Sequence, residues 1–152
     1  MRINDILTDS ILYEVVLPFT RNGNVGEFNY GDGRTMKVEI VPNGSDKGDW
    51  NISFYPLDQE SESNDKYDLS DANGEELSIF HTLWAFVNEW YNSDADNIEV
   101  ITAFGNSPKR QSLYFTMARR MARRYGGKAT TDASDVSWYS PAYFTNNGYS
   151  QP

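Results

Sequence analysis

Cysteine is absent from this 152-residue sequence, and histidine occurs once, as His81. The absence of cysteine excludes a disulfide framework, a thiolate zinc site and a cysteine nucleophile. One histidine cannot form a metal-binding cluster, and no serine and aspartate stand around His81 at the spacing of a catalytic motif. We therefore interpret His81 as a structural residue and expect no metal site.

Long apolar runs are also missing. No stretch approaches the ~20 apolar residues of a membrane span. Asp5 and Asp9 are acids within the segment that a signal peptide would occupy. We expect neither a membrane anchor nor an export signal.

Basic residues are few and unevenly placed. The chain has 13 lysines and arginines against 22 acidic residues, a net charge of −9, yet Ser107–Lys128 holds seven of the basic residues and no acid. The rest of the chain therefore carries six basic and 22 acidic residues, a net charge of −16. Because contacts with phosphates dominate nucleic-acid binding, so acidic a surface disfavours nucleic acid as a partner.

The basic segment Ser107–Lys128 has the clearest helical pattern in the chain. Ser107 is a good N-cap, Pro108 suits the first helical position, and Gly126 can adopt the left-handed conformation that ends a helix. Apolar residues at helical spacing form one stripe: Leu113, Tyr114, Met117, Ala118, Met121, Ala122 and Tyr125. Arginines are expected on its flanks and back: Arg110, Arg119, Arg120, Arg123 and Arg124.

Four of these arginines form two i, i+4 pairs on adjacent rows, Arg119 with Arg123 and Arg120 with Arg124. Their guanidinium groups can bind phosphates or carboxylates. Two interpretations remain open. The arginines are either an ordinary helix surface, partly neutralised by the chain's own acids, or a contact surface for an acidic protein partner.

Before this segment, alternating apolar residues predict antiparallel strands. Ile11–Pro18 is expected as a first strand ended by Pro18, with a turn over 20–24. Val25–Tyr30 and Arg34–Val41 flank Gly31-Asp32-Gly33 and predict a hairpin. Its expected core residues are Phe28, Tyr30, Met36, Val38 and Ile40, and Trp50, Ile52 and Phe54 alternate in a third antiparallel partner.

A strand–helix–strand–helix order follows. Asp58–Asp65 is expected to be an exposed, mobile acidic loop, and Lys66–Leu69 is a candidate short strand. A helix from Gly74 to near Ser93 and a strand over Ile98–Phe104 precede the basic helix, which predicts a crossover unit. The core stripe of the first helix is Phe80, Leu83, Trp84, Val87, Trp90 and Tyr91.

The C-terminal part has little pattern. Thr130–Asp135 is polar, Val136–Tyr139 is a candidate last strand, and Ser140–Pro152 lacks periodicity, which is typical of disorder. We expect a single α+β domain over 1–139, with a mostly antiparallel twisted sheet and two main helices, and a tail over 140–152. Contacts with neighbouring chains through its aromatic residues are a natural way to hold this tail, and the sequence leaves open whether it is ordered alone.

The order of these elements resembles the Gcn5-related N-acetyltransferase fold. The resemblance covers about half the chain and is sharpest at Ile98–Gly126, where Asn106, Leu113-Tyr114 and Tyr125-Gly126 stand roughly where the family has an Asn, a Leu-Tyr pair and a Gly-aromatic end. It implies that Tyr114 donates a proton to the departing thiolate of coenzyme A. Arg110, however, replaces a small residue, and the Asn is one position early.

The family's pyrophosphate loop should lie around Asp68–Glu76. This chain has a single glycine there, together with Asp68, Asp71, Glu75 and Glu76. Helix N-termini bind phosphate through free N–H groups and a positive field, which four acids would oppose. The resemblance therefore favours the fold and disfavours the activity, and we expect no cofactor.

The Leu-Tyr-x-x-Met-Ala-Arg-Arg-x-Ala pattern that starts at Leu113 also resembles small phage-encoded proteins. We predict a non-catalytic structural or interaction module of a phage particle or another multi-chain assembly, located in the virion or the host cytoplasm if phage-encoded. The alternatives are an N-acetyltransferase that uses acetyl-coenzyme A and an acidic decoy for a DNA-binding protein. The expected partner-binding residues are Arg119, Arg120, Arg123, Arg124, Tyr139, Tyr143, Phe144 and Tyr149.

Overall fold

The computed structural model describes residues 16–31, 33–44, 47–57, 76–93, 97–105 and 107–152. Several predictions fall outside the described residues: the acidic loop Asp58–Asp65, the strand Lys66–Leu69, Asn106, and most of the segments Ile11–Pro18 and Asp68–Glu76. These stay predictions.

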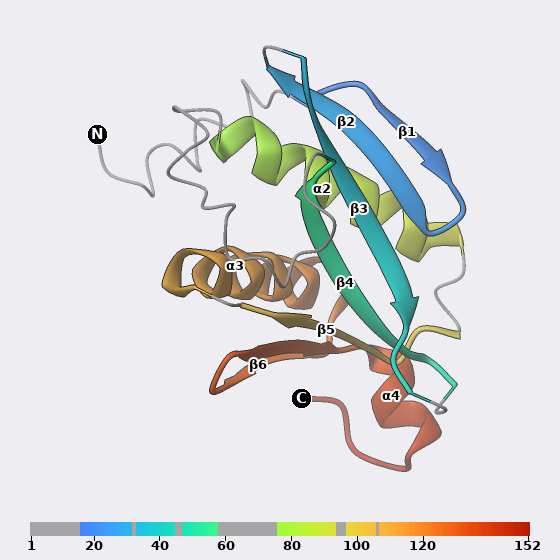
Figure 1. The fold of residues 1–152 in the computed structure, drawn as a ribbon. Helices are drawn as coiled ribbons and strands as arrows, with labels where there is room; N and C mark the ends of the chain where they lie inside the picture. The colour runs from blue at the N-terminus through green and yellow to red at the C-terminus, as the bar shows by residue number, and fades with distance from the viewer. Residues whose placement is uncertain (1–15, 32, 45–46, 58–75, 94–96, 106) are drawn as a thin grey trace.

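The described chain forms one seven-stranded sheet with three helices, in the strand order β1-β2-β3-β4-β5-β7-β6 (Figure 1). The strands are β1 (Phe19–Asn22), β2 (Val25–Gly31), β3 (Arg34–Pro42), β4 (Asp49–Pro56), β5 (Val100–Phe104), β6 (Lys128–Asp132) and β7 (Asp135–Tyr139). The helices are α2 (Glu76–Ser93), α3 (Pro108–Tyr125) and α4 (Pro141–Asn146). All neighbouring strands are antiparallel except β4 and β5, which confirms the α+β class and the mostly antiparallel sheet.

The predicted hairpin of β2 and β3 is confirmed. Phe28 lies opposite Met36, and the turn glycines Gly31 and Gly33 have φ of 133° and 75°, which other residues rarely adopt. The five expected core residues of these strands are all buried, and so are Ile52 and Phe54 of β4. Alternation therefore identified the face of the sheet that packs against the helices.

The described end of the predicted first strand differs from expectation. Residues 16–18 have no regular structure, and β1 begins at Phe19 and continues through Asn22, within the segment expected to be a turn. Proline has no N–H to donate, so Pro18 precedes the strand instead of closing it. The turn shrinks to Gly23 and Asn24, and Phe19 packs edge-on against Phe86 of α2 at 6.0 Å.

A parallel crossover is present, because β4 and β5 are parallel neighbours with α2 between them in the chain. It starts from β4, whereas the predicted crossover started from Lys66–Leu69, which lies outside the described residues. Their pairing is short and ends where Asn51 lies opposite Thr102. Beyond that point β4 stays paired with β3 as far as Pro56, and β5 stays paired with β7 as far as Phe104. The sheet therefore opens between β4 and β5 into two wings.

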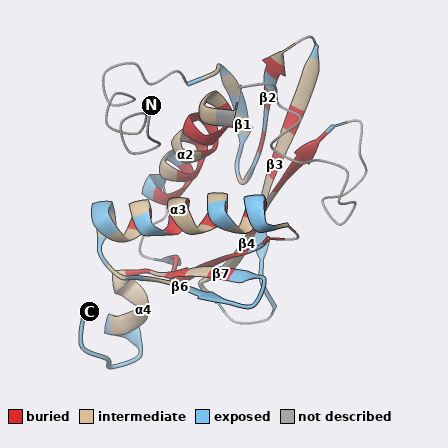
Figure 2. Ribbon diagram, turned by 90° about the vertical axis from the view of Figure 1, so that its left-hand side faces the viewer, coloured by how far each residue is buried: buried red, intermediate tan, exposed pale blue. Residues whose placement is uncertain are grey.

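Helices α2 and α3 cover the same face of the sheet. Trp90 of α2 packs edge-on against Trp50 of β4 at 5.3 Å, and Tyr91 packs against Trp138 of β7 at 5.3 Å. Figure 2 shows the buried positions where the helices and the sheet face one another. The expected α2 stripe is buried except for Trp84, which is partly exposed.

The ends of α3 are those that the sequence predicts. The Ser107 side chain accepts a hydrogen bond from the Arg110 N–H at 3.2 Å, and Gly126 has φ of 88° and donates its N–H to the Ala122 carbonyl at 2.9 Å. Of the predicted stripe, Tyr114, Met117, Ala118 and Met121 are buried, and Leu113, Ala122 and Tyr125 are partly buried.

Strand β6 was not predicted. Gly126 and Gly127, both with positive φ, turn the chain from α3 directly into β6, which forms a hairpin with β7 through Ala133 and Ser134. Four of its five residues are polar because β6 is the edge strand of the sheet, where little side-chain surface is buried, and only Ala129 packs against the core.

The predicted absence of structure in the tail is also wrong, because residues 141–146 form α4. Ser140 caps this helix and is itself fully buried, with its hydroxyl donating to the Ile98 carbonyl at 2.6 Å. Asn147 donates to the Glu99 carboxylate at 3.1 Å. Contacts within the chain therefore hold this segment, which answers the question that the sequence left open.

Candidate functional site: the arginine rows of α3 and the sheet edge

The four arginines expected to form one contact surface lie in two different environments. Positions four apart on a helix are offset by about 40°, so each row winds slowly around the helix axis. One row, Arg120 and Arg124, turns toward α2, and the other, Arg119 and Arg123, turns toward solvent on the side of β6.

The row beside α2 has a packing role. The Arg120 guanidinium lies over the rings of Phe80 and Trp84 of α2, 5.1 and 5.5 Å from their centroids. Arg124 donates from Nε to the Tyr125 hydroxyl at 3.2 Å, and that hydroxyl donates in turn to Asn88 of α2. Cation–π contacts of Arg120 therefore help to hold α3 against α2, whereas Arg124 is exposed and contacts Tyr125 of its own helix.

The row beside β6 is exposed. Within the described part of the chain, neither Arg119 nor Arg123 forms an ion pair, and the Arg119 guanidinium lies 5.8 Å from the ring centroid of Phe115 one turn earlier. Gln111, one turn before Phe115, reaches down to β6 and donates to the Thr131 hydroxyl at 3.1 Å and to the Ala133 carbonyl. We call Gln111, Phe115, Arg119 and Arg123 the outer row.

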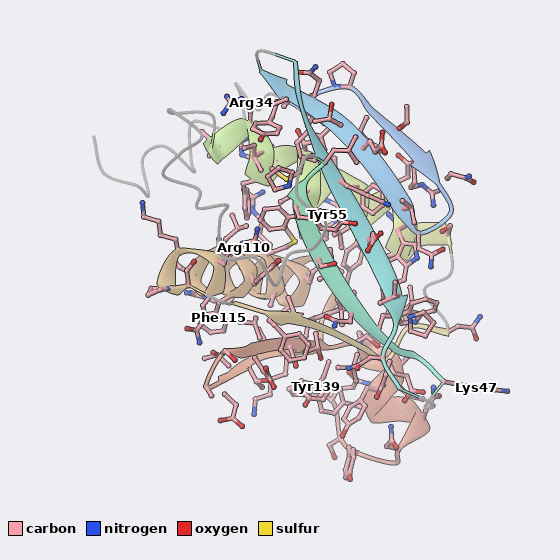
Figure 3. The ribbon with its side chains drawn as sticks, in the orientation of Figure 1. Arg34, Lys47, Tyr55, Arg110, Phe115 and Tyr139 are labelled. Carbon is pink, nitrogen blue, oxygen red and sulfur yellow. The ribbon has the colours of Figure 1, made fainter. Side chains whose placement is uncertain are left out.

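The prediction that Arg110 lies on the helix surface is wrong. Its side chain is buried at 3% exposure, and Nη1 donates to the Phe54 carbonyl at 3.0 Å while the guanidinium lies 4.5 Å from the Phe54 ring centroid. Phe54 is in β4 beyond the last residue paired with β5, so Arg110 occupies the opening between the two wings (Figure 3). Its position one turn before Tyr114 on the buried stripe was the available signal, which its charge obscured.

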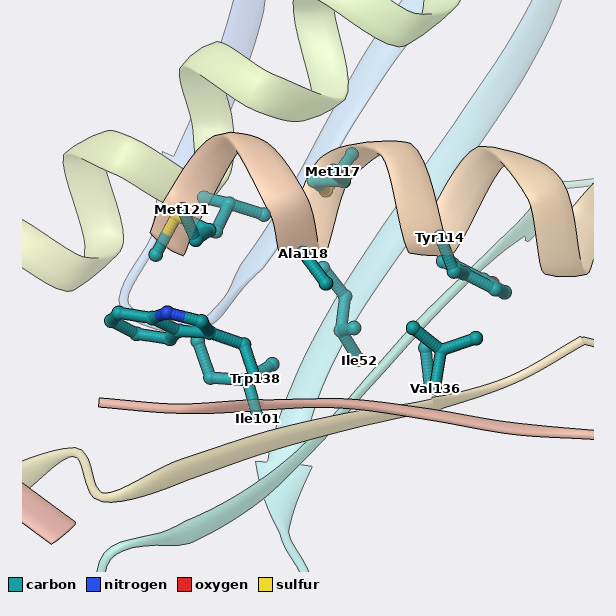
Figure 4. A pocket seen from close by; sticks show the side chains of 10 residues that line it. Ile52, Ile101, Tyr114, Met117, Ala118, Met121, Val136 and Trp138 are labelled. Atoms are coloured by element: carbon teal, nitrogen blue, oxygen red, sulfur yellow. The ribbon is translucent and has the colours of Figure 1, made fainter. Parts of the chain in front are cut away.

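Tyr114 is buried beside Arg110. Its ring packs edge-on against Phe54 at 5.7 Å, and the side chain is 3% exposed. Beneath this part of α3 the structure contains an apolar cavity of about 30 Å³, lined by residues of α2, α3 and the sheet (Figure 4). That volume holds little more than a water molecule, and apolar walls of this kind keep such a cavity dry.

The expected aromatic partner residues come together in a second surface, which we call the tyrosine cluster. Tyr143 of α4 packs against Tyr139 at 4.8 Å, against Phe144 at 5.3 Å, and stacks on Tyr149 at 5.9 Å. Tyr149 is 59% exposed. Burial raises the pKa of the Tyr143 hydroxyl above its ordinary value, and the neighbouring tyrosines raise it further.

The outer face of the sheet carries a polar group of interacting side chains on β3 and β4. The Tyr55 hydroxyl donates to the Glu39 carboxylate at 3.0 Å, and Lys37 forms an ion pair with the same carboxylate at 3.1 Å. Burial, followed by the hydrogen bond to Glu39, raises the pKa of Tyr55, and that carboxylate also raises the pKa of Lys37.

His81 is 1% exposed and contacts Phe80 at 5.9 Å, as expected for a residue inside the core. Among the described residues, no three histidine or carboxylate side chains lie close enough together to bind a metal ion. No helix in the described ranges has the length and apolar character needed to cross a bilayer.

No protein-family model, no curated protein and no solved structure matches this chain.

Proposed function

We propose that this protein is a non-catalytic interaction module of a phage particle or another multi-chain assembly, and that it contacts an acidic protein partner through the outer row of α3. The supporting observation is the exposure of Arg119 and Arg123, which form no ion pair with the acidic residues that the structure describes.

The tyrosine cluster is the second proposed contact surface. Tyrosine side chains supply a large contact area with few rotatable bonds and are enriched in protein interfaces. Ser140, which begins the segment, is fixed to Ile98, two residues before β5, by its buried hydrogen bond, so these rings are held in place before a partner binds.

Binding to polymers of known charge tests the proposal. Fluorescence anisotropy of the labelled protein should show saturable binding to poly-L-glutamate that weakens as salt rises, with no binding to poly-L-lysine. Reversing the charge of Arg119 and Arg123 together, with Arg119→Glu and Arg123→Glu, should weaken binding at least about tenfold, because two attractive contacts become repulsive. Tighter binding to duplex DNA than to poly-L-glutamate would contradict an acidic protein partner.

Lys47→Glu is the matched control, because each such reversal lowers the net charge by two. Lys47 is exposed in the turn between β3 and β4, far from α3 (Figure 3). It should change poly-L-glutamate binding less than about threefold. Equal losses in the control and in a single outer-row variant would assign the effect to net charge alone and reject the proposed surface.

The opening between β4 and β5, together with a crossover through α2, supports an acetyltransferase-like arrangement as a second candidate. Its proton donor would be Tyr114, but this hydroxyl is buried and Arg110 occupies the opening. Titration calorimetry tests whether acetyl-coenzyme A binds, but binding alone, including binding that is lost in Arg119→Glu, does not establish catalysis. An acetyl-transfer rate that falls in Tyr114→Phe is the result that would establish an acetyltransferase.

A further inference from the structure

We propose that the partner's acidic segment binds as an extended strand along the free edge of β6, with its acidic side chains on the face of the outer row. This inference rests on the proposed function and specifies its binding mode. It makes β6, which the sequence did not predict, part of the contact surface.

The free edge of β6 has backbone groups available for another strand. Asp132 and Asp135 lie opposite each other across the two-residue turn, and the pair that closes such a turn exchanges both N–H and C=O groups. Hydrogen-bonded pairs then alternate along β6, so the N–H and C=O groups of Ala129 and Thr131 point to the edge. In the described part of the sheet, no strand lies beyond β6.

The side chains of these two residues share the face that α3 covers. Ala129 lies opposite Trp138 and Thr131 lies opposite Val136, and both of these β7 residues line the cavity beneath α3. An antiparallel strand added at the edge would exchange hydrogen bonds with Ala129 and Thr131 through residues whose side chains project to the same face.

The outer row extends over this edge. Gln111 contacts Thr131 from above, and each later member of the row turns about 40° further from the sheet toward solvent. Arg119 and Arg123 therefore project progressively away from the sheet into solvent, on the helix-covered face above β6. Figure 2 shows α3 and β6 facing the same side of the molecule. Carboxylates at alternate positions of an added strand would meet these guanidinium groups.

An acidic partner fits better than a second copy of this chain. Two β6 strands could pair with Lys128 of each opposite Asp132 of the other, but this arrangement also brings two outer rows with the same charge together. The acidic partner has no such repulsion, and its backbone pairing supplies affinity while alternate side chains supply specificity.

The test uses a fluorescent peptide of about eight residues, a typical strand length, in which threonine and glutamate alternate. Anisotropy should report binding by the full chain, and the same peptide with glutamine in place of glutamate should bind at least about tenfold more weakly. Methylating the glutamate nitrogens should abolish binding, because these are the N–H groups that face β6. Methylating the threonine nitrogens should leave binding within about twofold.

Thr131→Pro tests the protein side of the contact. It removes one N–H at the free edge, which an edge strand tolerates, and should weaken peptide binding about tenfold. Thr131→Ala keeps that N–H and should bind like the unaltered protein. Circular dichroism must show the same fold for both variants, and the paired methylated peptides decide the question if Thr131→Pro does not fold.

Each outcome is decisive. Equal binding of the two methylated peptides would overturn strand addition while leaving charge-dependent binding, and hence the proposed function, in place. Loss of binding to every acidic probe would reject both. If sedimentation equilibrium shows that the free protein dimerises and that Thr131→Pro abolishes the dimer, the partner at the β6 edge is a second copy of this chain. If single-stranded nucleic acid binds more tightly than the acidic peptide, the partner is a nucleic-acid polyanion.

Discussion

Gly127→Ala should destabilise the protein more than any exchange at an open turn glycine, because Gly127 sets the path from α3 into the proposed docking edge. Gly127 has φ of 84°, and a methyl carbon there would have three backbone atoms of Tyr139 and Ser140 within 3.2 Å. None of these is the movable end of a side chain. Relief therefore requires β6 and β7 to shift relative to each other.

The expected cost follows from three contributions. The left-handed conformation costs an alanine about 1 kcal/mol, and overpacking against fixed atoms costs about 1–3 kcal/mol. The lower entropy of alanine in the unfolded chain offsets about 0.4–1 kcal/mol. The free energy of unfolding should therefore fall by about 2–3 kcal/mol.

Gly23→Ala is the matched control. Gly23 also has a positive φ, of 64°, but no atom lies within 4 Å of the position that a methyl carbon would take. Urea unfolding should show a loss of at most about 1 kcal/mol for Gly23→Ala, with unchanged dependence on urea in both variants. Equal losses would show that backbone conformation alone sets the cost and that the close approach of β7 has no effect.

Three further results are expected. Arg110→Lys should lower the free energy of unfolding by about 2 kcal/mol. The buried guanidinium donates to the Phe54 carbonyl, and a lysine ammonium in its place is more strongly hydrated and so costs more to bury. The same exchange at an exposed arginine of α3 should have almost no effect on urea unfolding. The raised pKa of Tyr55 means that the folded state holds the hydroxyl proton more tightly than the unfolded state does. The contribution of this group to stability is therefore complete below about pH 10 and is lost as pH rises further. In Tyr55→Phe, which cannot ionise beside Glu39, the melting temperature should fall less over the same rise in pH. Gly26→Ala should cost about 2–4 kcal/mol, because its methyl carbon would overlap an α2 phenylalanine ring and lie 2.8 Å from a β1 carbonyl oxygen; a cost below about 0.5 kcal/mol would show that this contact relaxes freely.

Sequence patterns predicted the elements that bury an apolar face. The hairpin of β2 and β3 alternates because one face meets the helices, and α3 has its stripe and its caps at Ser107 and Gly126 for the same local reasons. Strand β6 escaped prediction because an edge strand buries too little to require alternation. The helix α4 begins with Ser140-Pro141, the same signal as Ser107-Pro108, but six residues are too few to show a period.

The candidate site was predicted in its residue types and not in its arrangement. The sequence places Arg119–Arg123 and Arg120–Arg124 on two rows, but only the packed position of α2 determines that Arg120 lies over aromatic rings while the other three arginines stay exposed. Similarly, the charge of Arg110 favours the surface until the opening between β4 and β5 offers a carbonyl acceptor and an aromatic ring. Tertiary packing overrides the local preference in both cases.

The charge distribution of the chain explains how a small basic face could be selective. Outside Ser107–Lys128 the net charge is −16, so an acidic partner is repelled over most of the surface and attracted only near α3. Repulsion at the wrong faces contributes to specificity as attraction at the right face does. Salt screens the outer row and the acidic surface alike. Raising the salt concentration should therefore reduce both the affinity for the partner and the preference of the partner for one orientation. A partner strand that also pairs with the backbone of β6 would retain its register under these conditions, because those hydrogen bonds depend little on ionic strength.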